Sequence, residues 1–343
     1  MDVNVSLDLT DHQYCFIAIS KSCIKEYRSS ATKICLYVIF SLGLTLTLCG
    51  NGVVILSISY FKQLHTPTNF LVLSLAVADF LIGLVVMPFS MIRTIETCWF
   101  FGESFCLFHS SLDISLTTIS VFHLMFIAVD RYYAICQPLF YPFRITNHII
   151  LVFITISWIL PVAYSYGIIY TKFGILESYV SALSCQGQCV LIINALWSPV
   201  HALFSFFIPC LVMLGMYAKI LFVAKKHAKV IHSTEQNHSL KENRKHYQKR
   251  ESKATKTLAI VMGVFIFCWL PVFVDVIADP YMNFITPTVV YDAMVWLGYF
   301  NSTFNPLIYA FFYPWFQKAL QCILTCRILG HASATRNLIT EHN

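Results

Sequence analysis

The sequence predicts an all-α membrane protein, in which seven transmembrane helices form a bundle and a short amphipathic helix follows on the membrane surface. Of its 343 residues, 57% are hydrophobic and only 12% are charged, with a mean hydropathy of +0.68. Soluble domains are typically about 25% charged. The apolar residues gather in runs long enough to cross a bilayer, for which about 20 residues suffice. These runs lie at 34–61, 68–92, 104–129, 149–170, 190–224, 256–279 and 287–313.

Basic residues orient the predicted bundle, 34–313. If the N-terminal segment 1–33 is extracellular, 17 of the 23 Lys and Arg residues lie inside the cell and the other 6 outside. The opposite orientation would break the positive-inside rule. Nine basic residues lie in the predicted third intracellular loop, 225–253, where they serve topology and solvation and also suit anionic lipid. The net charge of +6 therefore does not indicate nucleic-acid binding.

The N-terminal segment also carries modification signals. It has charged residues throughout and no uninterrupted apolar core, so we do not expect a cleavable signal peptide. Asn4 begins an extracellular Asn-x-Ser sequon and is a glycosylation candidate. An even number of extracellular cysteines predicts three disulfides, with the connectivity left open. These six cysteines are Cys15, Cys23, Cys98, Cys106, Cys185 and Cys189.

Residues 314–326 follow the last apolar run and have apolar side chains at helical spacing. This pattern predicts an amphipathic helix lying on the membrane, with a cytoplasmic tail at 327–343. Cys322 and Cys326 lie four residues apart on it and are palmitoylation candidates, or else ordinary cysteines.

The third apolar run contains an acidic residue, Asp113. A carboxylate there costs several kcal/mol unless it faces the bundle interior and finds a partner. The only basic residue near the outer halves of these runs is Arg93. Asp113 is therefore either bonded to neighbours such as Tyr299, which we expect to reach it, or it awaits a cationic ligand. Thr117 and Ser120 share its helix face.

Two motifs carry a resemblance to a known family. Asp130-Arg131-Tyr132 closes the third run, and 301–316 reads Asn-Ser-x-x-Asn-Pro-x-x-Tyr-x-x-x-Tyr-x-Trp-Phe. The second pattern is similar in full to the seventh-segment fingerprint of the trace-amine-associated receptors, which are rhodopsin-like G-protein-coupled receptors. The resemblance covers roughly 33–325. It implies a multi-pass protein of the plasma membrane that binds a small amine and activates a heterotrimeric G protein.

The resemblance also implies disulfide pairings and a resting ion pair. The expected disulfides are Cys106–Cys189, Cys15–Cys185 and Cys23–Cys98. Arg131 is expected to pair with Asp130 and Glu251 at rest and to meet the G protein after release. The other residues that the resemblance assigns to activation are Tyr132, Tyr217, Phe265, Trp269, Pro271, Asn305, Pro306 and Tyr309.

Asp79 lies in the second run, where its carboxylate also needs polar or charged partners inside the membrane. Ser120, Asn301 and Asn305 are plausible companions. The resemblance implies that this cluster holds a sodium ion, for which oxygen ligands are suited. The alternative is a cluster of hydrogen bonds between helices without an ion.

The expected ligand pocket combines an acidic anchor with aromatic, apolar and a few polar side chains, a cage suited to an ammonium ion. No acid occurs between Asn194 and Tyr217, so a diamine receptor with a second carboxylate there is disfavoured and we expect a monoamine. Asp275, Asp279 and Asp292 near the outer mouth could still attract cations. The predicted pocket residues are Asp113, Ile114, Thr117, His201, Ser205, Trp269, Val272, Phe273, Trp296 and Tyr299.

Most members of the family are olfactory receptors that raise cyclic AMP through a stimulatory G protein, and the resemblance implies the same here. Val272 departs from it, because related receptors often have an aromatic residue after the proline of this segment. A conventional biogenic amine receptor, for serotonin or histamine, is the alternative. A transporter is more remote, since neither internal repeats nor paired broken helices are present. No nucleophile–base pair or metal set indicates an enzyme, and no cofactor beyond the sodium ion is expected.

Overall fold

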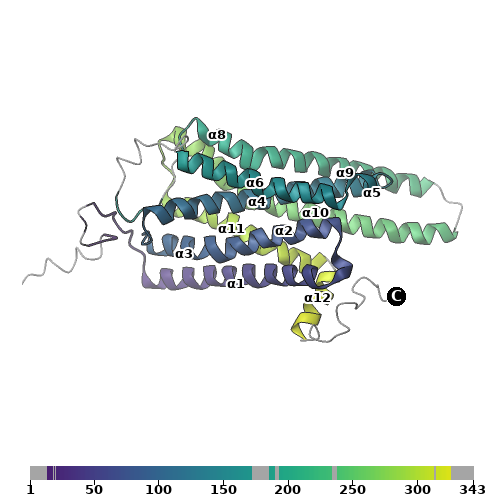
Figure 1. Ribbon diagram of the computed structural model, residues 1–343, viewed down its shortest axis with the longest axis horizontal. Coiled ribbons are helices and arrows are strands. Elements are labelled where there is room, and N and C mark those ends of the chain that lie inside the picture. The colour runs from purple at the N-terminus through teal and green to yellow at the C-terminus, as the bar shows by residue number, and fades with distance from the viewer. Residues whose placement is uncertain are drawn as a thin grey trace, which may run out of the picture.

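The computed structural model describes residues 14–17, 19, 21–171, 185–189, 193–233, 238–312 and 314–325. Within them the chain is helical, apart from isolated bridges between short extended pieces. The long helices lie side by side along the long axis of the molecule, and the short α12 turns away at the end opposite the N-terminal segment (Figure 1). This confirms the predicted all-α bundle. Asn4, Cys326 and the tail 327–343 lie outside the described residues.

The first half of the bundle consists of four long helical spans. The second span is one continuous helix of three parts, because a π-helical turn, η2, joins α2 to α3. A short helix, α5, lies in the loop between α4 and α6. The bounds are α1 Ser30–Tyr60, η1 Lys62–Leu64, α2 Pro67–Leu81, η2 Ile82–Val86, α3 Met87–Glu96, α4 Glu103–Cys136, α5 Tyr141–Arg144 and α6 Asn147–Thr171.

The second half contains the remaining three spans and the surface helix. The fifth span again has a π-helical turn, η3, between α8 and α9. The bounds are α8 Trp197–Ala202, η3 Leu203–Phe207, α9 Ile208–Ser233, α10 His238–Ala278, η4 Asp279–Met282, α11 Thr288–Phe312 and α12 Pro314–Leu324. Of the described helices, six are long and apolar enough by composition to cross a membrane. The seventh, α11, carries several buried polar side chains that lower its hydropathy.

Local sequence explains where these helices begin and bend. Ser29 and Thr66 cap α1 and α2 by accepting hydrogen bonds from backbone N–H groups three residues on, at 3.1 and 3.3 Å. Pro67 occupies the first turn of α2, where its missing N–H costs nothing. Both π-turns end just before a proline, Pro88 or Pro209. A proline inside a helix removes a hydrogen bond and crowds the preceding turn, which favours such irregular turns.

The predicted intracellular stretch 225–253 is largely helical. Helix α9 continues to Ser233 and α10 begins at His238, so most of this stretch continues the two helices beyond the apolar runs. Lys, Glu, Gln and Arg, which are frequent here, are good helix formers, so the high charge does not oppose a helix. The predicted start of the fifth span at 190 is too early, because α8 begins at Trp197.

Helix α4 lies at the centre of the bundle and packs against α2, α6 and α9. Of the six helices that are apolar enough by composition to cross a membrane, it is the most buried. Its two ends carry the two candidate functional regions, because Asp113 lies near the extracellular end and Arg131 near the cytoplasmic end. They are 18 residues apart, which is five helical turns or about 27 Å.

Helix α12 confirms the predicted helix after the seventh span. Its apolar face packs on α1, where Phe316, Ala319 and Cys322 join a cluster with Val54 and Ile58. Cys322 is only 4% exposed. Its burial against the bundle argues against the predicted palmitoylation of this residue, since an acyl chain needs an accessible thiol.

Candidate functional site

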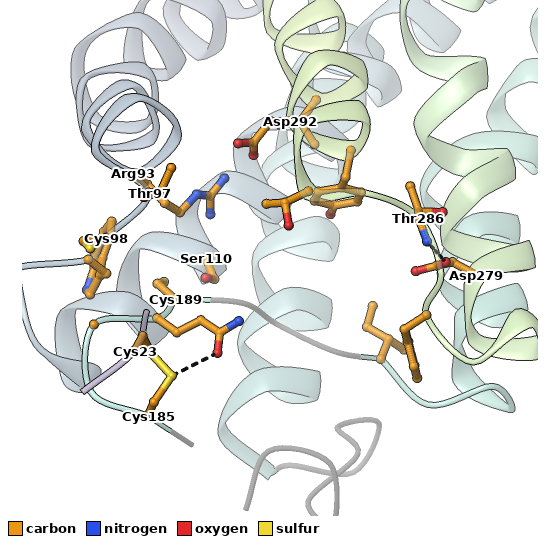
Figure 2. Close-up of a pocket in the computed structure, with 18 of the residues that line it drawn as sticks. Cys23, Arg93, Thr97, Cys98, Ser110, Cys185, Cys189, Asp279, Thr286 and Asp292 are labelled. Atoms are coloured by element: carbon orange, nitrogen blue, oxygen red, sulfur yellow. Dashed lines mark hydrogen bonds between the residues drawn. A yellow bond between two sulfur atoms is a disulfide. The ribbon is translucent and has the colours of Figure 1, made fainter. Parts of the chain in front are cut away.

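A cavity of about 940 Å³ opens at the extracellular end of the bundle. Figure 2 shows its lining side chains, which come from the N-terminal segment, α3, α4, the loop before α8, and the facing ends of α10 and α11. Five acidic and two basic side chains line it, so the cavity is negative overall. The acidic residues are Glu26, Asp113, Asp275, Asp279 and Asp292, and the basic ones are Lys21 and Arg93.

Three disulfides tie together the extracellular side of the cavity. Cys106–Cys189 joins the start of α4 to the loop before α8, as expected. The other two are Cys15–Cys98 and Cys23–Cys185. The predicted partners, Cys15–Cys185 and Cys23–Cys98, are therefore wrong.

The path of the N-terminal segment explains the pairing. The segment folds back on itself, because the N–H of Cys15 donates to the carbonyl of Cys23 at 2.9 Å. The N–H of Cys23 in turn donates to the carbonyl of Gln186 at 2.9 Å, which holds Cys23 beside Cys185. This leaves Cys15 next to Cys98. Lys21, Ser22 and Glu26 of the same segment line the cavity.

Asp113 lies at the floor of the cavity and is bonded to α11. The hydroxyl of Tyr299 donates to Asp113 Oδ2 at 2.5 Å, which confirms the predicted contact. Ser90 Oγ of α3 lies 3.3 Å from the same hydroxyl, so three helices meet at this point. Ile114, also predicted, lines the cavity beside Asp113. Thr117 instead donates to the backbone carbonyl of Asp113 at 2.7 Å and does not line the cavity.

His201 lines the opposite wall, on α8. Its Nδ1 atom lies 3.2 Å from the hydroxyl of Tyr164 and 3.4 Å from Ser205 Oγ. The rings of Tyr164 and His201 are parallel, with their centroids 6.0 Å apart. Tyr164 was not predicted as part of the site. The span contains several other hydroxyl-bearing side chains, so no sequence signal singles out Tyr164.

The predicted aromatic residues lie behind the cavity wall. Trp269 packs against Gly298, where an added Cβ would come within 2.8 Å of the indole ring. Phe273 stacks on Phe206 with ring centroids 4.7 Å apart. Val272 and Ser205 are likewise buried and do not line the cavity.

Trp296 was predicted in the ligand cage and is turned away from it. Its ring stacks on Phe40 of α1 at 3.7 Å between centroids, and its Nε1 donates to Thr94 at 3.2 Å. Because both contacts are with α1 and α3, Trp296 fixes α11 against its neighbours and does not line the cavity.

Asp79 lies deeper in the bundle, with its side chain fully buried. It accepts three hydrogen bonds, from Ser120 Oγ at 3.0 Å, Ser302 Oγ at 2.8 Å and Asn305 Nδ2 at 2.8 Å. Ser120 and Asn305 were predicted. Asn301 was also predicted, but its buried Nδ2 has no hydrogen-bond partner within the described structure. Ser302, one residue on, holds the position next to Asp79.

These residues fit a small monovalent cation. The cluster offers one carboxylate and two hydroxyl groups, and the buried Oδ1 of Asn305 has no hydrogen-bond partner among the described residues. Oxygen ligands of this kind suit a hard cation. The same hydrogen bonds would also stabilise a neutral or charged Asp79 without an ion, so the geometry is compatible with both interpretations that the sequence allowed.

At the cytoplasmic end of α4, Asp130 is fully buried and accepts several hydrogen bonds. Arg131 donates to Asp130 Oδ2 from Nε at 2.9 Å, which confirms the predicted pair. Thr68 also donates to Oδ2, at 2.8 Å, and Tyr141 donates to Oδ1 at 2.9 Å. Thr68 and Tyr141 were not predicted, because neither belongs to a recognisable motif. The side chain of Glu251 lies outside the described part of the structure.

Tyr141 remains a hydrogen-bond donor over the physiological pH range. Its burial, together with the negative charge of Asp130, raises the pKa of its hydroxyl above the usual value. Next to this cluster, a second cavity of about 290 Å³ is lined by Arg131, Thr68 and Tyr309. Tyr132, the third residue of the motif, has Lys219 Nζ 5.7 Å from its ring centroid. The cytoplasmic end thus combines a partly buried ion pair with an open cavity.

Comparisons with known proteins agree with this architecture. Residues 50–309 match the family described as 7 transmembrane receptor (rhodopsin family). The chain is 51% identical to trace amine-associated receptor 13c of Danio rerio, in an alignment that covers 99% of this chain and all of that protein. It is 49% identical to trace amine-associated receptor 4 of Mus musculus, over 96% of each chain. It is 45% identical to trace amine-associated receptor 6 of Pan troglodytes over the full length of both.

Proposed function

Because the chain belongs to the trace amine-associated receptors of the rhodopsin family, we propose that it detects a small volatile or trace amine in an olfactory role, with Asp113 as the anchor of the ammonium group. It is a multi-pass receptor of the plasma membrane and not an enzyme. We further propose that it couples to a stimulatory G protein and raises cyclic AMP. The relatives named above are all trace amine-associated receptors, which favours this proposal over a conventional biogenic amine receptor or a transporter.

The observation that carries the amine proposal is the position of Asp113. It lies at the floor of a negative cavity and keeps a single hydrogen-bonded side-chain partner among the described residues, Tyr299. A ligand ammonium ion would add charge-assisted hydrogen bonds in a place shielded from water, where such bonds are strong. The acidic side chains nearer the opening would raise the local concentration of cations.

The opposite wall favours a monoamine. His201, Tyr164 and Ser205 form a polar chain there without a carboxylate. A hydroxyl, ether or other neutral polar group of the ligand would suit this chain, whereas a second ammonium ion would lack a counter-charge. Trp269 and Phe273, behind the wall, complete the predicted aromatic surroundings.

The arrangement of α4 and α10 supports the signalling half of the proposal. Asp130 and Arg131 form a partly buried pair of the kind expected at rest, supported by Thr68 and Tyr141. Trp269 lies two residues before Pro271, a residue that bends helices, so a ligand-driven shift of the indole would be amplified at the cytoplasmic end of α10. We propose that Arg131 is then released toward the G protein. Tyr217, Phe265, Pro306 and Tyr309 are proposed to take part in this change.

A panel of volatile, aromatic and diamine compounds, with cyclic AMP as the readout, tests the function. We expect at least one amine to raise cyclic AMP in cells expressing the chain and Asp113→Ala to abolish the response at equal surface expression. Asp275→Asn is the matched control, because it removes a different acid from the same cavity, and should retain the response. An amine response that survives Asp113→Ala would refute the anchor.

We also propose that Asp79, Ser120 and Asn305 hold a sodium ion that favours the resting state. The buried amide oxygen of Asn305 without a partner supports this. Agonist binding to membranes should weaken when sodium chloride replaces choline chloride, and Asp79→Asn should remove the difference. Equal agonist affinity in both salts for the unmodified receptor would favour the cluster of hydrogen bonds without an ion.

A further inference from the structure

Arg93 places a positive charge inside the cavity that also contains the proposed amine anchor. Figure 2 shows its side chain directed into the cavity and toward Asp292 on the neighbouring helix. The electrostatic partners of the guanidinium include Asp292 and Asp113. No carboxylate oxygen of a described residue lies within 4.0 Å of it, so the group forms no direct ion pair in the described structure.

The helix geometry places Arg93 above the floor and below the opening. Ser90 contacts Tyr299 at the floor, and Arg93 follows Ser90 by three residues, about one turn nearer the outside. Asp292 precedes Tyr299 by seven residues on α11 and thus shares its face, about 10 Å higher. Going outward along this wall, the charges therefore alternate: carboxylate at Asp113, guanidinium at Arg93, carboxylate at Asp292.

This alternation has a consequence for ligands. An ammonium group bound at Asp113 leaves the rest of the ligand extending past Arg93. A second ammonium group on that path would be repelled by the guanidinium, although Asp292 lies beyond it. A carboxylate or other acceptor at the same place would be attracted and could accept two parallel hydrogen bonds from the guanidinium.

We propose that Arg93 determines ligand specificity, by rejecting diamines whose second ammonium group lies along the α3–α11 wall and by favouring amines with a neutral or anionic group there. The inference rests on the proposed function, since it takes Asp113 as the anchor. It names a residue that selects ligands by charge. This selection is independent of the earlier argument, which rests on the absence of an acidic residue from α8 and α9. Negative selection of this kind, through a repulsive contact, is a general route to specificity.

Three probes share a five-carbon chain and differ in the charge at the end remote from the anchored ammonium group. They are pentylamine, 1,5-diaminopentane and 5-aminopentanoate. Receptor-driven nucleotide exchange in membranes gives the potency of each, whichever G protein is coupled. In Arg93→Gln we expect 1,5-diaminopentane to gain about tenfold in potency and 5-aminopentanoate to lose about tenfold. A tenfold change corresponds to about 1.4 kcal/mol, which is within the interaction energy of two unit charges a few ångströms apart in a partly screened environment. Pentylamine should shift by less than about threefold.

Two variants serve as controls. Arg93→Lys keeps the charge and should retain the ranking of the three probes. Lys21→Gln removes a positive charge from the exposed rim of the same cavity and should change the potency ratios little. Opposite shifts for the two charged probes cannot come from a folding or expression defect, because such a defect lowers all responses together.

The outcomes distinguish this inference from the function on which it rests. A receptor that neither these three probes nor any amine of the panel activates, or whose amine response survives Asp113→Asn, would overturn the amine anchor and the inference with it. A normal pentylamine response with unchanged potency ratios in Arg93→Gln would overturn the role of Arg93 alone. Equal shifts for all three probes would also overturn it, since they would mean that Arg93 only competes for Asp113.

Discussion

Tyr299 and Asp113 are 186 residues apart in the chain, yet the tyrosine hydroxyl donates to the Asp113 carboxylate over 2.5 Å. This bond joins α11 to α4 at the cavity floor, and α4 carries Arg131 at its other end. A ligand ammonium group at Asp113 would share the carboxylate with Tyr299. Ligand binding is thereby connected to the packing of two helices that extend to the cytoplasmic side.

Replacing Tyr299 with Phe should lower amine potency by about tenfold or more. The variant removes a hydrogen bond to a charged acceptor, of the kind that contributes about 1.5–3 kcal/mol. Concentration–response curves at matched surface expression measure the change. Ser90→Ala removes only the longer contact to the same hydroxyl and should shift potency less. Equal potency of Tyr299→Phe and the unmodified receptor would contradict a supporting role for the bond.

Replacing Ser302 with Ala should destabilise the bundle more than replacing Ser57 with Ala. Ser302 donates to the buried Asp79 carboxylate of another helix at 2.8 Å, whereas Ser57 donates to the Val53 carbonyl of its own helix. Both serines are buried. Removing a partner from a buried charge is costly, about 1–3 kcal/mol or more. Thermal midpoints of the solubilised receptor give the comparison, and a larger loss for Ser57→Ala would count against the prediction.

The disulfide pairing makes a prediction about double variants. If Cys15 is bonded to Cys98, then Cys15→Ser and Cys98→Ser should each reduce surface expression, and the double variant should be no worse than either alone. Combining Cys15→Ser with Cys185→Ser breaks two different bonds and should have a larger effect. Peptide mapping under non-reducing conditions identifies the pairs directly. Recovery of a Cys15–Cys185 peptide would refute the arrangement.

Replacing Tyr141 with Phe should raise signalling without ligand. The variant removes a donor to Asp130 and so weakens the ion pair between Asp130 and Arg131, which favours release of Arg131 by up to about tenfold. Basal cyclic AMP per surface receptor is the readout. A tyrosine hydroxyl ordinarily titrates near pH 10, and burial beside Asp130 raises the pKa of Tyr141 further, so the difference should not vary between pH 6 and 8. Unchanged basal activity would show that this bond does not restrain the receptor.

Most helices and the residues that motifs identify were predictable from the sequence. Periodicity and hydropathy located the seven spans. Asp113, Asp79 and Arg131 were evident because charged side chains inside the membrane are costly and usually functional. Ser302 was missed in favour of Asn301, because one residue on a helix rotates a side chain by about 100° and motif matching does not resolve that rotation. Thr68, Tyr141 and Tyr164 were missed because common polar residues acquire their partners only through packing.

The disulfide pairing and the orientation of Trp296 could not be predicted for a different reason. The pairing depends on the reversal of the N-terminal segment between Cys15 and Cys23, which has no signature in composition. The direction of Trp296 depends on Phe40 and Thr94, which lie on other helices. Both are decided by contacts between segments that are distant in sequence.

The π-turn η2 means that the second span contains one more residue than a regular helix would need over the same length. If all of these residues formed a regular α-helix without the π-turn, the outer part of the span would fall out of register with its neighbours. Everything from Met87 outward would then rotate by about 100° and move by about 1.5 Å along the axis. Arg93 would leave the cavity and Ser90 would lose Tyr299, although neither residue had been changed. The charge pattern of the cavity is therefore encoded partly as a residue count, which comparison of side-chain identities alone would overlook.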